Sequence, residues 1–446
     1  MSEGREAPSS PLQALRGLRG AEVPFSLAMF ACFFLVITSF WILKPLKKAL
    51  FVEYYDRSGF ELLGRSFGAA EAELLAKVLN LAVAFGAVLV FSALSRRLRR
   101  ERLILAFTVA FLAAYAGYFA LLGDPGAGTI WSFYLFGDLF STVMVAAFWA
   151  FLNDSVDTER ARWLYGPIGL GGVLGGVFGS MAVGAGIDAW SLRVWLGVCM
   201  VLGVGIALAA LAGGRIARRA DFAPQRSQAP PPAPRRGSAL RGAALVARSP
   251  YLLAMAGLVG FYEVASTILD FQFTSAVAHY LDGSDIGSHM ARVFAITNAV
   301  SASVQLFATS FVMARYGVGI ALLVLPVAVL SGSAAFLALP SLWAGSALNT
   351  LDNGFSYSIN QSAKEALYVP RSREEKYQAK AFIDMFVMRF AKVLAVGISL
   401  AAGAWLDSFQ GVRALSLAVL GVAVAWIAVA RYAGRRFASL EGSPPR

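Results

Sequence analysis

The sequence predicts an all-α membrane protein with twelve transmembrane helices in two bundles of six. The 446 residues have a mean hydropathy of +0.63 and only 15% are charged, whereas soluble domains carry about 25% charged residues. Apolar stretches of about 20 residues, long enough to cross a bilayer, recur along the chain. A Pro- and Arg-rich segment divides these stretches into six and six, a layout typical of transporters built from two parallel repeats.

Short polar gaps separate the apolar stretches. The twelve predicted spans are residues 25–43, 73–94, 103–122, 130–152, 165–186, 192–213, 250–272, 290–313, 318–338, 341–362, 381–403 and 412–432. The spans 73–94 and 381–403 are the least regular because both contain charged side chains, among them Lys77 in the first.

The predicted domain organisation follows from these spans. It consists of a cytoplasmic N-terminus (1–24), an N-terminal six-helix bundle (25–213), a Pro/Arg-rich cytoplasmic linker (214–248), a C-terminal six-helix bundle (249–435) and a cytoplasmic tail (436–446). The linker is expected to be flexible because of its composition.

Charged residues in the gaps predict the orientation. Arginines and lysines gather in alternate gaps, and the positive-inside rule then places both termini in the cytoplasm of a multi-pass inner-membrane protein. The net charge of +12 is therefore explained by membrane topology, and no nucleic-acid partner is expected. The N-terminus lacks the pattern of a signal peptide.

Three lysines after the first span break this charge pattern. Lys44, Lys47 and Lys48 lie on the side of the membrane that is otherwise poor in basic residues. Their spacing of i, i+3 and i+4 puts them on one helix face if the helix continues past Pro45. A cationic face of this kind would attract an anionic substrate. The alternative is that the lysines extend to the membrane surface without a binding role.

Three of the carboxylates inside predicted spans, where an isolated charge costs about 2.5–3.5 kcal/mol, are candidate site residues. Asp138 follows Gly137 in the fourth span and is expected to pair with a basic residue in one conformation, either for gating or as a structural ion pair. Asp270 fits the same argument in the seventh span, with Glu263 two turns earlier, and one of these two is interpreted as a polar helix-packing residue. Asp352 lies in a tenth span rich in Asn, Ser, Gln and Tyr, a composition that suits a wet or substrate-lined surface.

A weak internal repeat links two of these carboxylates. Asp138 precedes Glu159 by 21 residues, and Asp352 precedes Glu374 by 22 residues. The equivalent positions of the two pairs favour duplication of a six-helix unit, with Asp352 as the counterpart of Asp138.

Two cations in the eleventh span, Arg389 and Lys392, indicate a cavity-facing surface. Lys392 is the preferred candidate for contact with an anion or a carboxylate, and a structural ion pair is the alternative.

Glycines dominate one face of the fifth span. Gly171, Gly175 and Gly179 recur every four residues, as do Gly172 and Gly176. Neither the P-loop pattern nor the dinucleotide-binding pattern is satisfied. The small-xxx-small spacing predicts close helix packing instead.

Other chemistry is not expected. His279 and His289 have no Cys or Glu cluster beside them, so a metal site is not predicted, and no cofactor is implied. Cys32 and Cys199 lie in apolar spans and are interpreted as small core residues. No nucleophile–base arrangement is readable, so the protein is not predicted to be an enzyme.

Four segments resemble the nucleotide translocases of plastids and obligate intracellular bacteria, the major-facilitator-like ADP,ATP carrier family. These segments are ILKPLKKALFVE (42–53), FYLFGDLFSTVMVAAFWAFLND (133–154), RWLYGPIGLGGVLGGVFGS (162–180) and SAKEALYVPRSREEKYQAKAFIDMF (362–386). The chain differs from the family pattern at Pro45 and Lys48, and by having aspartate where the family has glutamate.

The resemblance implies roles for individual residues. Lys47 matches the functional lysine of the first family motif, and Asp138 falls where the family has its glutamate. Asp270 and Lys392 fall near the other functional acidic and basic residues, with Lys380 as a competitor for Lys392.

The expected function is antiport of nucleotides such as ATP and ADP by alternating access. The candidate substrate-binding residues are Lys44, Lys47, Asp138, Asp270, Asp352 and Lys392. The expected partners are a small anionic substrate and the lipid bilayer. A proton-coupled transporter of another solute, with Asp138 as proton carrier, and a non-transporting membrane scaffold are the alternatives.

Overall fold

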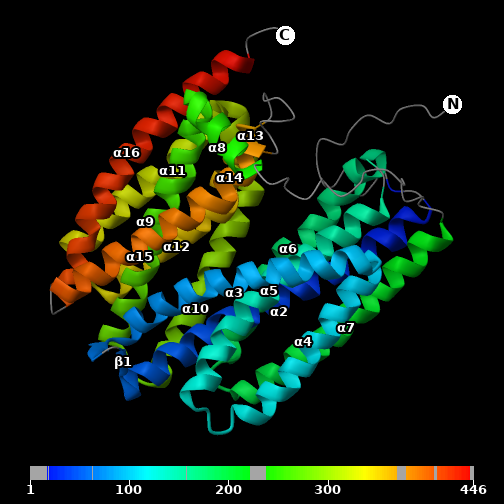
Figure 1. Cartoon of the computed structure of the whole chain (residues 1–446), viewed down its shortest axis with the longest axis horizontal. Coiled ribbons are helices and arrows are strands. Elements are labelled where there is room, and N and C mark those ends of the chain that lie inside the picture. Colours follow the sequence, from blue (N-terminus) through cyan, green and yellow to red (C-terminus); the bar gives the residue numbers. More distant parts are fainter. Residues whose placement is uncertain are drawn as a thin grey trace. The chain divides into compact units, whose positions relative to one another are not determined.

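The computed structural model describes residues 18, 20–62, 64–156, 158–220, 238–368, 378–405 and 409–441. Nearly all of these residues are helical (Figure 1). The exception is a two-stranded antiparallel hairpin of β1 (Phe60–Leu62) and β2 (Arg65–Phe67), in which Phe60 pairs with Phe67. The sequence analysis does not predict this short hairpin. Gly59 and Gly64 have φ values of 67° and 75°, which glycine adopts without the strain of a side chain.

The structure has helices at all twelve predicted spans. In the first half these are α2 (Glu22–Ser58), α3 (Ala69–Arg97), α4 (Arg100–Leu121), α5 (Ala127–Ser155), α6 (Thr158–Gly186) and α7 (Leu192–Arg219). In the second half they are α9 (Pro250–Tyr280), α10 (Ser284–Ser303), η1 (Val304–Thr309), α11 (Ser310–Ala338), α12 (Leu342–Phe355), η2 (Ser356–Asn360), α13 (Gln361–Ala366), α14 (Lys380–Phe382), η4 (Ile383–Val387), α15 (Met388–Trp405) and α16 (Phe409–Glu441).

Within the described residues, ten helices are long and apolar enough to cross a membrane. Residues 284–338, which cover two predicted spans, form one of the ten, and the helices over 342–366 are not among them. Gly317 interrupts the long segment, because its φ of 81° and ψ of 169° are not helical. This interruption lies at the boundary that the sequence places between residues 313 and 318.

The chain separates into two compact units. The first contains residues 1–54, 79–228 and 290–295, and the second contains residues 55–78, 229–289 and 296–446. Each unit has its own hydrophobic core. The unit boundaries cut through α2, α3 and α10, so residues of these helices are shared between the two.

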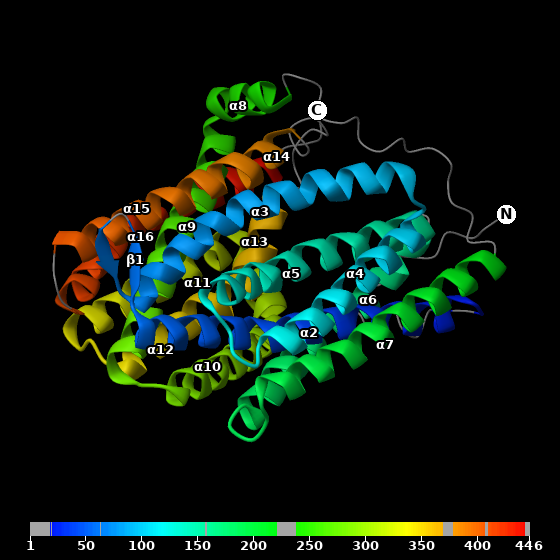
Figure 2. The same ribbon diagram turned by 60° about the horizontal axis from the view of Figure 1, so that its bottom comes forward.

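In the first unit, α4 packs against both α5 and α7, and α4 lies beside α7 in both views (Figures 1 and 2). Large buried aromatic side chains fill this core, including Phe133, Phe140 and Phe148 from α5. Cys32 and Cys199 are both buried and free, as the sequence analysis predicts.

The glycine face of α6 lies against the backbone of α2. A Cβ atom at Gly171, Gly175 or Gly179 would come within 2.6, 2.5 and 2.6 Å of the carbonyl oxygens of Phe30, Phe34 and Thr38 respectively. Real Cβ atoms do not approach a carbonyl so closely, so glycine is required for this contact. The predicted role of these glycines in helix packing is confirmed.

In the second unit, α9 packs against α12, α15 and α16, and α11 packs against α16. Among the described residues, the π-helical segments η1, η2 and η4 interrupt the helices of this unit. Such turns occur frequently at functional sites.

The predicted linker contains helix at both ends. Helix α7 continues to Arg219, and Ser238–Arg248 form helix α8. Helix α8 packs against α9 and α14 (Figure 2). The remainder of the linker, residues 221–237, lies outside the described residues, as do Glu374 and the basic residues between 369 and 377.

Candidate functional site

An ion pair in the first unit joins two of the predicted site residues. Lys47 on α2 pairs with Asp138 on α5, and the lysine side chain is 5% exposed. The carboxylate also accepts a hydrogen bond from the Asn80 side-chain amide, at 2.8 Å from Oδ2. The Lys47 ammonium lies 4.3 Å from the centre of the Tyr134 ring, a favourable cation–π distance.

Local sequence explains how this pair fits between the helices. Helix α2 continues through Pro45 to Ser58, so Lys44, Lys47 and Lys48 remain on one helix as the spacing requires. A Cβ atom at position 137 would lie 2.6 Å from Cδ of Lys47. Gly137 therefore provides the space through which the lysine reaches the neighbouring carboxylate.

Lys44 occupies a different environment one turn earlier on α2. Its ammonium lies 4.4 Å from the Trp41 ring centre and 5.2 Å from that of Phe294. Both rings are buried. The aromatic faces stabilise the charge of the lysine in an apolar setting.

A second charged cluster, in the second unit, surrounds Asp270. Lys77 on α3 pairs with Asp270 on α9, and its Nζ lies 2.8 Å from the Glu73 carboxylate one turn earlier on α3. Asn349 on α12 is fully buried and donates to Asp270 Oδ1 at 3.5 Å. One lysine thus faces two carboxylates, and the Glu73 side chain is 1% exposed.

The sequence analysis did not identify Lys77, Glu73 or Asn80 as site residues. A signal for the first two was present, because a glutamate and a lysine at i and i+4 inside an apolar span share one helix face. Asn80, one turn further along α3, carries no such signal.

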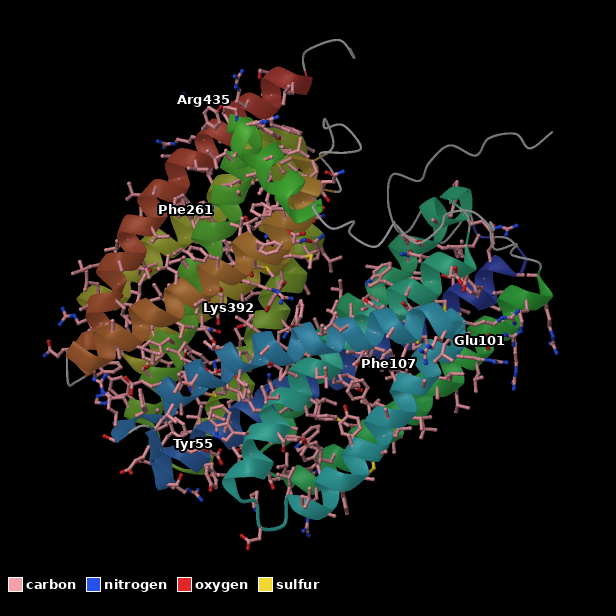
Figure 3. All side chains as sticks on the ribbon, in the orientation of Figure 1. Tyr55, Glu101, Phe107, Phe261, Lys392 and Arg435 are labelled. Carbon is pink, nitrogen blue, oxygen red and sulfur yellow. The ribbon has the colours of Figure 1, made fainter. Side chains whose placement is uncertain are left out.

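Asp352 and Lys392 have other partners in the second unit. Asp352 is 1% exposed and accepts a hydrogen bond from Ser266 Oγ at 2.6 Å. Lys392, labelled on α15 in Figure 3, lies 3.9 Å from the Glu263 carboxylate of α9. Lys380, the competing candidate, donates to both oxygens of Glu365 at 2.7 and 2.5 Å.

The two predicted repeat counterparts have different contacts in the structure: Asp138 pairs with Lys47, and Asp352 accepts a hydrogen bond from Ser266. The internal repeat stays a prediction. The two histidines also have non-metal roles. His279 stacks on Phe409 with ring centres 4.3 Å apart, and His289 hydrogen-bonds to Ser346 at 2.7 Å. A search for metal-ligand clusters among the described residues finds none.

Solved structures of transporters share this fold. A variant of the nucleoside transporter NupG is 16% identical, with a TM-score of 0.61 over 94% of this chain and all of that chain. A bacterial homologue of the human lysosomal transporter Spinster is 14% identical, with a TM-score of 0.56 over 96% of this chain and all of that chain. The chain therefore has the fold of these transporters, and ten of its described helices are long and apolar enough to cross a membrane.

Sequence comparison identifies the family. The model of the TLC ATP/ADP transporter family matches residues 126–343 and 337–437, and the chain belongs to this family. The chloroplastic ADP,ATP carrier protein 2 of Arabidopsis thaliana is 23% identical over 92% of this chain and 73% of its own length. ADP,ATP carrier protein 1 of Chlamydia pneumoniae is 24% identical over 88% of this chain and 87% of its own length.

The resemblance expected from the four sequence segments is confirmed by this match. The family consists of transporters and not of enzymes, in agreement with the sequence analysis.

Proposed function

We propose that this protein exchanges nucleotides, with ATP and ADP as the leading candidates, across the inner membrane of its cell by alternating access. The family match over residues 126–343 and 337–437 carries this proposal. Twelve helices cross the membrane in this account, six in each half of the chain, and both termini are cytoplasmic.

The lysines of the charged sites neutralise the substrate phosphates. Lys47 and Lys392 are assigned this role, with Lys44 in support, because each is a cation held at a transmembrane helix beside a carboxylate or aromatic rings. An anionic phosphate group would form charge-assisted hydrogen bonds with such lysines.

The carboxylates act as counter-ions that exchange with substrate. In the structure, Asp138 pairs with Lys47 and Asp270 pairs with Lys77. When phosphate occupies Lys47, its bond to Asp138 weakens. A ligand shifts the equilibrium between two conformations only if it binds them differently, and this replacement of one anion by another supplies that difference. Asp352, hydrogen-bonded to Ser266, is assigned to the polar lining of the same pathway.

Reconstitution into liposomes tests the function. Purified protein in liposomes loaded with ADP should take up labelled ATP, and empty liposomes should take up little. Uptake that follows an imposed pH gradient and ignores internal nucleotide would favour the proton-coupled alternative. Absence of any nucleotide-dependent uptake, with protein correctly inserted, would contradict the proposal.

A further inference from the structure

Six charged side chains gather in the second unit around helices α9, α13, α14 and α15. Among the described residues they comprise three lysines and three carboxylates: Glu263, Lys364, Glu365, Lys380, Asp384 and Lys392. An anion that binds one of these lysines must therefore compete with a neighbouring carboxylate.

The contacts within this cluster differ in tightness. Glu365 holds Lys380 with oxygen–nitrogen distances of 2.5 and 2.7 Å. Glu263 and Lys392 are 3.9 Å apart, beyond the 2.7–2.9 Å of a charge-assisted hydrogen bond. The Glu263 contact is therefore the weaker of these two and requires less free energy to open.

Glu263 also interacts with a second lysine. The Lys364 ammonium lies 5.0 Å from the ring centre of Tyr262, the residue that precedes Glu263 on α9. The charge of Lys364 interacts with those of Glu263, Asp384 and Glu365. Glu263 on α9 thus contacts a lysine of α15 and interacts electrostatically with a lysine of α13.

The position of Glu263 makes its charge costly. It lies near the middle of α9 (Pro250–Tyr280), one of the helices long enough to span the membrane, and its side chain is 13% exposed. A carboxylate at such a position is expected to have a functional or structural counter-ion. Lys392 and Lys364 provide this counter-charge, and the Lys392 contact is long at 3.9 Å.

We propose that Glu263 is the resident counter-ion of Lys364 and Lys392, and that a phosphate group of the transported anion displaces it from both lysines. Lys364 is then a phosphate-binding residue beside Lys392. Glu263 competes with substrate and lowers its affinity, which favours release and rapid turnover. This inference rests on the proposed nucleotide exchange for the identity of the anion.

Neutralising Glu263 tests the competition directly. In ADP-loaded liposomes, Glu263→Gln should lower the KM for labelled ATP by about 5-fold or more, the smaller end of typical coupling between two sites. It should also lower the maximal rate, because bound nucleotide leaves more slowly. Glu263→Asp keeps the charge and should stay near the wild-type KM. Glu101→Gln, which removes the carboxylate that pairs with Arg218 in the first unit, is the matched control and should leave the KM unchanged.

A second variant tests the lysine. Lys364→Gln should raise the KM for ATP by about 10-fold, as expected when a charge-assisted hydrogen bond worth about 1.5 kcal/mol is lost. In a Lys364→Gln background, Glu263→Gln should lower the KM by less than it does alone. If Glu263→Gln does not accumulate in the membrane, the Lys364→Gln result still decides whether this lysine binds phosphate.

The outcomes separate this inference from the proposed function. If wild-type protein exchanges nucleotides but neither variant changes the KM, the role of Glu263 and Lys364 is wrong and the exchange function stands. If wild-type protein exchanges no nucleotide, the exchange function is wrong. In that case the anion site is still testable by measuring the binding of inorganic pyrophosphate through the intrinsic tryptophan fluorescence. Glu263→Gln should increase the affinity for pyrophosphate, and an unchanged affinity would overturn the inference.

Discussion

The two units hold their principal lysine–aspartate pairs in different ways. In the first unit, Lys47 faces Asp138, and the neutral Asn80 amide completes the contacts of the carboxylate. In the second unit, Lys77 faces two carboxylates, Asp270 and Glu73. The first pair joins one lysine to one aspartate, and we propose that a phosphate replaces the aspartate. In the second, one lysine contacts two carboxylates, so we expect Lys77 to be required for stability in addition to any role in transport.

The largest expected effect concerns the two carboxylates that contact Lys77. Lys77→Met should lower the free energy of unfolding by about 3–5 kcal/mol, because Glu73 and Asp270 each lose a cation that they contact. Thermal unfolding in detergent measures this loss. Lys392→Met is the matched control, and it should cost less because that lysine is 36% exposed and 3.9 Å from its carboxylate. Equal stability of the two variants would remove the proposed difference between the pairs.

The next effect concerns transport through the Lys47–Asp138 pair. Lys47→Ala should reduce ATP exchange about 10- to 100-fold, because a charged hydrogen bond to substrate contributes about 1.5–3 kcal/mol. The matched control is Lys48→Ala, a neighbouring buried lysine to which no phosphate-binding role is assigned. Rates from proteoliposomes, normalised to inserted protein, give the comparison. Equal losses in both variants would show that positive charge on α2 matters without a specific role for Lys47.

A smaller effect is expected where α6 supports the helix that carries Lys47. Gly175→Ala places a Cβ atom 2.5 Å from the Phe34 carbonyl oxygen and should cost about 1–3 kcal/mol of stability. At Gly169 on the same helix a Cβ atom meets nothing within 4 Å. Gly169→Ala should therefore be neutral or stabilising by up to about 1 kcal/mol. In thermal unfolding, Gly175→Ala should lower the stability and Gly169→Ala should leave it unchanged or raise it. A similar loss of stability in both variants would contradict the packing role of Gly175.

The smallest effect is expected at the amide that completes the first pair. Asn80→Ala removes the 2.8 Å hydrogen bond to Asp138 and leaves Lys47 in place. Exchange should change by about 3- to 10-fold, since a hydrogen bond contributes about 1 kcal/mol on average. The KM for ATP should change by a larger factor than the maximal rate. Asn153→Ala, at a side chain that contacts Tyr165 instead, should leave the KM unchanged.

Sequence patterns predict the positions of the helices because hydrophobic length is a local property. They also predict the glycine face of α6 and the placement of Lys44, Lys47 and Lys48 on one helix. Lys47 and Asp138 could be identified as candidates for pairing because each places an unusual charge in or beside an apolar span.

The pairing of Lys77 with Asp270 could not be read from the sequence, because 193 residues separate them and only tertiary packing joins them. The hairpin over 60–67 was missed because three-residue strands carry little hydrophobic pattern. The π-helical turns have no sequence signature of the kind used here, so the local geometry beside Asp352 was not predictable.

The most direct test of the central claim compares wild-type and Lys47→Ala protein in ADP-loaded and empty liposomes within one experiment. Labelled ATP should enter only loaded vesicles containing wild-type protein, and Lys47→Ala should lower this uptake at least about 10-fold. Equal uptake into loaded and empty vesicles, or full exchange by Lys47→Ala, would contradict nucleotide exchange through this lysine–carboxylate pair.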